Sequence, residues 1–222
     1  MKKINIILFA LSFIMTSCIN SVTISNVETK ILSKSLQIDS SEYSKIKEQF
    51  LIKGDISSIS NDLSSLNPKF ALAEIILDGI ECKSSKSFIV PSGFLSKKCK
   101  KYIIKENNSY KLIEDTDELK KIFAPIDSKE EALSFAVAVS SFYPKYDNFT
   151  SNDNPNSTIY KTALIEKTNV KENKDDYIVN LFNTFCFKLT EYILKINKNG
   201  DFEIISTNDI AEDGHNKGII CD

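Results

Sequence analysis

The stretch that decides the fold reads SKEEALSFAVAV, from Ser128 to Val139. Its first four residues match the Ser-x-x-Glu capping box that begins a helix. The residues that follow are apolar almost all round a helical turn, which is typical of a helix covered on several sides. Its alanines leave room for a sheet to approach the backbone closely. We therefore predict a buried helix here, against which the rest of the C-terminal half packs.

Beyond this helix lie a polar loop at 143–157 and a series of strand candidates. The sequence Asn-Lys-Asn-Gly-Asp at 197–201 is a strong hairpin signal. Short turns between neighbouring strands force antiparallel pairing, because parallel pairing needs a long crossover. We therefore expect the helix to pack on an antiparallel meander, whose strands cover 158–168, 176–184, 188–197 and 202–207.

The layout of 128–207, a helix followed by a meander with a glycine-centred turn, is similar to that of PepSY-like and cystatin-like modules. The resemblance rests on the order of the elements and on no motif. It implies an α+β fold. It also implies one function that such modules carry, which is the inhibition or regulation of an exported peptidase.

The preceding half of the chain combines short helices with strands. Helical spacing of Tyr43, Ile46 and Phe50 predicts a first helix, and Asp115-x-x-Glu118 caps a second that runs to residue 123. Strands are expected at 70–82, which contains an Asp-Gly turn, at 88–90, and in a hairpin formed by 102–104 and 110–113. The predicted fold class is α+β, with helices packed on antiparallel β-sheet. One domain over 41–222 is expected, with sub-halves 41–125 and 126–222.

The N-terminus reads as an export signal. Two lysines precede an apolar run from Ile4 to Met15, and this run is shorter than the roughly 20 residues that cross a bilayer. A basic head, a short apolar core and small residues before a cut are typical of a secretory signal. The chain then reads Met15-Thr16-Ser17-Cys18, which resembles the lipobox of bacterial lipoproteins.

This resemblance implies a signal peptide over 1–17, cleavage before Cys18, and acylation of that cysteine by chains such as palmitate. Two acyl chains give stable membrane anchoring where one gives only reversible binding. We therefore expect a lipid-anchored protein of the bacterial cell envelope, outside the cytoplasm, with 18–40 as lipidated cysteine and tether. Ile19 is not the Asp that resembles an inner-membrane retention signal, which favours the outer membrane in a cell that has one.

Charge and cysteine content indicate which partners and which disulfides to expect. The net charge is −2 and all 28 basic residues are lysines, whereas nucleic-acid recognition relies on arginine and net positive charge. Nucleic acid is therefore not an expected partner. Four cysteines remain beyond Cys18, and an even number in an exported protein predicts two disulfides. Local pairing is favoured, although three pairings are open; the candidates are Cys82 with Cys99 and Cys186 with Cys221.

No constellation of catalytic or metal-ligating residues is visible. His215 is the only histidine and lies in a polar tail, and the 143–157 loop lacks the ligand spacing of a calcium site. We expect no cofactor and no metal. One cluster could contact an anionic surface, and it contains Lys97, Lys98, Lys100 and Lys101. A solvated turn around a structural disulfide is the favoured alternative.

The sequence therefore predicts a non-enzymatic binding or structural module. Its expected partners are the bilayer, through acylated Cys18, and an unidentified envelope protein or polymer. The alternative function is inhibition or regulation of an exported peptidase.

Overall fold

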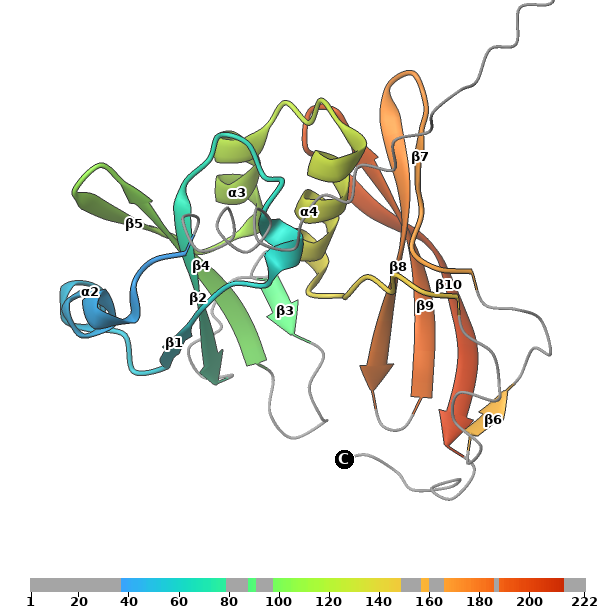
Figure 1. Ribbon diagram of the computed structural model, residues 1–222, viewed down its shortest axis with the longest axis horizontal. Helices are drawn as coiled ribbons and strands as arrows, with labels where there is room; N and C mark the ends of the chain where they lie inside the picture. Colours follow the sequence, from blue (N-terminus) through green and yellow to red (C-terminus); the bar gives the residue numbers. More distant parts are fainter. Residues whose placement is uncertain are drawn as a thin grey trace, which may run out of the picture.

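The computed structural model describes residues 37–78, 88–90, 98–148, 157–159, 166–185 and 188–213. These residues form two five-stranded antiparallel sheets with helices packed between and beside them (Figure 1). The predicted α+β class is thereby confirmed. No helix in these ranges is long and apolar enough to cross a membrane.

The first sheet lies in the N-terminal half. Its long strand β4 pairs with β2 along one edge, from Lys98 to Lys105. Two strands share the other edge of β4: β3 pairs with the beginning of β4, and β5 pairs with the end of β4. The sheet contains β1 (Asp55–Ser57), β2 (Ala71–Asp78), β3 (Phe88–Val90), β4 (Lys98–Glu106) and β5 (Ser109–Ile113).

The second sheet has the strand order β6-β10-β9-β8-β7, and β7 to β10 form the meander. Asn197 to Asp201 make the tight turn between β9 and β10, where Gly200 has a φ of 85°. The strands are β6 (Ser157–Ile159), β7 (Val170–Glu172), β8 (Asp176–Phe185), β9 (Lys188–Asn197) and β10 (Phe202–Asp213).

The helices α3 (Thr116–Phe123) and α4 (Lys129–Ser140) lie between the two sheets (Figure 1). Ser128 caps α4 by accepting a 3.1 Å hydrogen bond from the Glu131 amide, and Asp115 caps α3 in the same way. The largest core cluster joins residues of both sheets to these helices. The alanines of α4 that face this core are fully buried, namely Ala132, Ala136 and Ala138.

A smaller core covers the opposite face of the first sheet. There α2 (Tyr43–Phe50), preceded by the 3₁₀ turn η1 (Ser40–Glu42), packs on Ala73, Ile75 and Ile103. A second 3₁₀ turn, η2 (Asn61–Leu63), joins the central core. The molecule is thus layered as α2, first sheet, α3 and α4, second sheet.

Several boundaries differ from those expected. β10 runs six residues past the predicted end at 207, and the short strand β7 was not expected. Of the strand predicted at 158–168, only Thr158 and Ile159 lie in β6; 160–165 fall outside the described residues. The domain begins by Gln37, inside the predicted tether, because Ile38 is 3% exposed and its amide donates to the Leu72 carbonyl at 2.9 Å.

The expectation of two disulfides is not supported within the described residues, where no two cysteines lie at bonding distance. Cys99 is the only cysteine in these ranges. It is 1% exposed and is disulfide-bonded. Cys82, Cys186 and Cys221 all lie outside, and the pairing stays a prediction.

Candidate functional site

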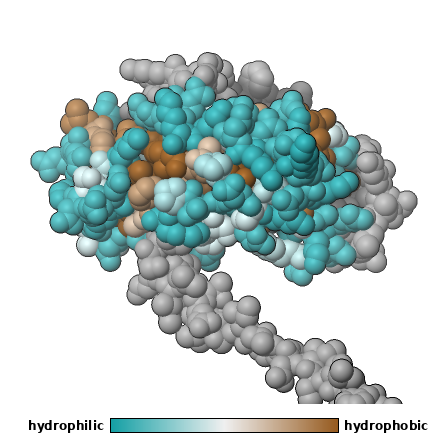
Figure 2. All heavy atoms as spheres, turned by 90° about the horizontal axis from the view of Figure 1, so that it is seen from above, coloured by the Kyte–Doolittle hydropathy of each residue, from teal (hydrophilic) through white to brown (hydrophobic). Residues whose placement is uncertain are grey.

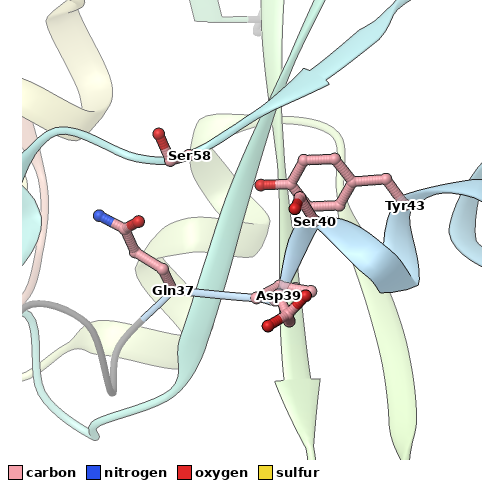
Figure 3. Close-up of a pocket in the computed structure, with 6 residues that line it drawn as sticks. Gln37, Asp39, Ser40, Tyr43 and Ser58 are labelled. Atoms are coloured by element: carbon pink, nitrogen blue, oxygen red, sulfur yellow. The ribbon is translucent and has the colours of Figure 1, made fainter.

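A polar groove opens where the chain enters the domain (Figure 3). It has a volume of about 380 Å³ and is open to solvent. Its walls come from the segment before α2, from the first residue of α2 and from the residue after β1. The lining residues are Gln37, Ile38, Asp39, Ser40, Tyr43 and Ser58.

Main-chain contacts hold one wall of this groove in place. Gln37 forms a parallel bridge with Leu72, which continues the edge of β2 beyond β1. The Gln37 side-chain amide also donates to the Ile59 carbonyl at 3.4 Å. Asp39 begins η1 by accepting a 2.9 Å hydrogen bond from the Ser41 amide. The groove is therefore built on the sheet and on a helix start.

Tyr43 supplies the opposite wall. Figure 3 shows its hydroxyl and the Gln37 amide on opposite sides of the groove, with Ser58 beside them. Burial raises the pKa of the Tyr43 phenol, and the nearby Asp39 carboxylate raises it further. The phenol therefore stays protonated at neutral pH and can donate a hydrogen bond.

The chemistry of the groove is that of hydrogen bonding. The amide and the three hydroxyls can both donate and accept, whereas Asp39 contributes the one charge. An uncharged ligand with several hydroxyl groups matches this set of donors and acceptors. A second carboxylate for acid–base chemistry is not among the lining residues.

A second hollow of about 280 Å³ lies at the far end of α2. Polar atoms make up the larger part of its exposed lining, and the ion pair between Lys101 and Glu114 lies on one side. Its apolar lining residues are Phe50, Leu51, Ile52, Ile75, Leu77 and Leu112.

The lysine cluster predicted from the sequence does not form one basic surface in the described residues. Successive residues of a strand point to opposite faces, so Lys98 and Lys100 on β4 are separated from Lys101. The Lys100 amine lies 3.1 Å from Glu74, and Lys101 pairs with Glu114. The local sequence does not reveal these carboxylates, because they come from β2 and from the residue that follows β5. Lys97 lies outside the described residues.

The other predicted site residues are not brought together. Cys18 and His215 lie outside the described residues, as does most of the 143–157 loop. The Asn148 side chain lies in the described part of that loop, and it accepts a hydrogen bond from the Lys167 amide at 2.9 Å. Within the described ranges, no group of three or more His, Cys, Asp or Glu residues could hold a metal ion.

No sequence signal marked the groove as a site, and Tyr43 was read only as part of a helix. Gln37 and Asp39 fall in a stretch of Ser, Thr, Asn and Lys that reads as a tether, and Ser58 lies in a serine-rich segment. Only the pairing of Gln37 with β2 reveals that this stretch belongs to the domain. The chain matches no family model, no curated protein and no solved structure.

Proposed function

We propose that the protein is a lipid-anchored module of the bacterial cell envelope that binds a polar, largely uncharged ligand in the groove at Gln37 and Tyr43. The observation that carries this proposal is the lining of the groove, an amide and three hydroxyls beside one carboxylate. Such groups suit the hydroxyls of an envelope polysaccharide. The lipobox-like sequence ending at Cys18 supports the location.

The position of the groove fits a membrane-bound protein. Its first lining residue, Gln37, lies within the stretch 18–40 that was expected to act as tether. The groove would therefore lie on the side of the domain at which the anchor enters. A polymer close to the bilayer could reach it there.

Binding can be tested by titrating the protein with soluble glycan fragments of the cell wall and following amide chemical shifts by NMR. We expect shifts at Gln37, Ser40 and Ser58. Tyr43→Phe keeps the ring and removes the hydroxyl, so it should weaken binding several-fold. Thr207→Ala, an exposed change on β10, is the control. Unchanged shifts in this groove would refute the proposed ligand.

The location can be tested by intact mass. We expect the mature chain to begin at Cys18 and to carry the mass of at least two acyl chains. An unmodified chain that still contains residues 1–17 would overturn the proposed anchoring.

We further propose that two disulfides form, Cys82 with Cys99 and Cys186 with Cys221. The buried, bonded state of Cys99 supports the first. Closing a loop of this length stabilises a fold by about 3 kcal/mol in the loop-entropy model. Peptide mapping without reduction would identify the partner of Cys99, and a link to Cys186 or Cys221 would contradict this pairing.

A further inference from the structure

The C-terminal end of α2 exposes a leucine in a constrained conformation. Leu51 is 85% exposed, more than any other large hydrophobic residue in the described ranges. Its φ is 53°, in the left-handed region that costs a non-glycine residue free energy. Hydrogen bonds fix this end, because the Ile52 amide donates to the Lys47 carbonyl at 3.0 Å. Leu51 is therefore held outward by the helix end.

Leu51 lies beside two other apolar residues at the end of α2. Phe50 and Ile52 are half-buried beside it, and all three line the 280 Å³ hollow described above. Ile75, Leu77 and Leu112 of the first sheet form the floor of that hollow. We call Phe50, Leu51 and Ile52 the α2 tip. Figure 2 shows that one face of the molecule is mainly hydrophilic, with hydrophobic residues gathered in separate patches.

The position of α2 in the chain indicates what covers this tip. The part of the chain that leads to the predicted anchor ends at Gln37, and α2 begins at Tyr43. A random-coil tether of the proposed length, from Ile19 to Leu36, would span about 25 Å, and an eight-residue helix spans about 12 Å. The tip therefore lies within reach of the bilayer that holds Cys18. In Figure 1, α2 lies at the end of the molecule farthest from the second sheet.

Charge near the tip is balanced. Lys47, Lys53 and Lys101 are accompanied by Glu48, Asp55 and Glu114. Lys47 lies 3.4 Å from Asp55, and Lys101 pairs with Glu114. Attraction to anionic lipid would therefore be weak, and apolar contact would dominate.

We propose that the α2 tip docks on the bilayer to which the protein is anchored, with Leu51 inserted among the lipids. This inference rests on the proposed lipid anchoring. One leucine and its neighbours would bind a free bilayer only weakly. The tether raises the effective concentration of the membrane, so that weak contact becomes persistent. Docking would fix the orientation of the domain and hold the polar groove close to the membrane surface.

Because the chain contains no tryptophan, a single Leu51→Trp substitution reports on this site alone. The full acylated chain would be reconstituted into vesicles of phosphatidylethanolamine and phosphatidylglycerol, with and without lipids brominated along the acyl chain. We expect blue-shifted emission and at least two-fold quenching at position 51. The same substitution at Thr207, which is exposed on the second sheet, should show neither effect.

Quenching at position 51 should change little when phosphatidylglycerol is replaced by phosphatidylcholine, because the charge is balanced. Equal, weak quenching at positions 51 and 207 in acylated protein would overturn the docking proposal and leave the anchoring intact. A chain that lacks acyl groups by intact mass would instead refute the anchoring. Circular dichroism of both variants confirms that each is folded.

Discussion

The Tyr102 hydroxyl donates a hydrogen bond to the Ala138 carbonyl at 3.0 Å, and so joins β4 of the first sheet to the last turn of α4. The last four carbonyls of a helix have no partner within it. Tyr102 is 1% exposed, which means that water cannot satisfy this carbonyl in its place. The contact is thus a buried polar link between the first sheet and α4.

Replacing Tyr102 by Phe should destabilise the protein. The substitution leaves the Ala138 carbonyl buried without a partner, and such a loss costs about 1–3 kcal/mol. For a domain of this size the unfolding midpoint should fall by roughly 2–10 °C. Thermal denaturation followed by circular dichroism measures this shift. An unchanged midpoint would show that the hydrogen bond contributes nothing net.

Tyr177 provides the matched contrast. It is also fully buried, but its hydroxyl has no hydrogen-bond partner among the described residues. Burial raises the pKa of this phenol, and the carboxylates of Glu172 and Asp127 add to the effect. Tyr177→Phe removes an unpaired polar atom, so we expect no loss of stability or a gain of up to about 1 kcal/mol. A loss equal to that of Tyr102→Phe would contradict this account.

Glu42, the last residue of η1, links the start of α2 to the hairpin of β4 and β5. Its carboxylate accepts hydrogen bonds from the Lys105 amine, at 2.6 Å, and from the Tyr110 hydroxyl. The bond from Lys105, followed by that from Tyr110, lowers the pKa of Glu42. A lowered pKa in the folded state means that the stabilisation is present above the ordinary carboxyl pKa. It is lost as the pH falls through the folded-state value.

Glu42→Gln should therefore lower the unfolding midpoint at pH 7, and the difference from the unmodified protein should shrink below about pH 4. Midpoints measured across pH 3–7 test this. Glu48→Gln, an exposed change on α2, should leave the profile unaltered. A difference that is constant with pH would show that the charge of Glu42 is not involved.

Local signals in the sequence predicted the elements whose determinants lie close together in the chain. The capping box at Ser128 and the alanines after it predicted α4, and Gly200 predicted the turn between β9 and β10. β7 was not predicted because Val170, Lys171 and Glu172 carry no alternating pattern. Only their pairing with β8 makes them a strand.

The candidate site could not be predicted in the same way. Its Gln37 belongs to the domain through a bridge to Leu72, thirty-five positions later. The carboxylates that pair with Lys100 and Lys101 likewise come from β2 and from the residue after β5. Such long-range contacts determine which polar residues line a groove and which charges are already paired, and residue spacing does not contain them.

Ser134 connects the middle of α4 to the segment that follows β1. Its side chain is buried, accepts a hydrogen bond from the Ser65 amide at 3.2 Å and donates to the Asp62 carbonyl. Ser134→Ala would leave both main-chain groups without this partner, so we expect a loss of about 1–3 kcal/mol. Urea denaturation gives the free energy of unfolding. Ser57→Ala, an exposed change, should alter it by no more than about 0.5 kcal/mol.

Gly54 sets the close approach between the chain beyond the α2 tip and β2. A Cβ atom there would lie 2.5 Å from the Ile76 carbonyl oxygen and 2.7 Å from a methyl group of Leu77. The carbonyl belongs to a paired strand and cannot move without disturbing the β1–β2 ladder. Gly54→Ala should therefore cost about 1–3 kcal/mol. Asp55→Ala, whose side chain is fully exposed, is the neighbouring control. Because the substitution would displace the chain that holds Leu51 outward, hydrogen exchange at Ile52 and Lys53 should also accelerate. Unaltered stability and exchange would show that β2 moves to accommodate the Cβ atom without loss in the free energy of unfolding.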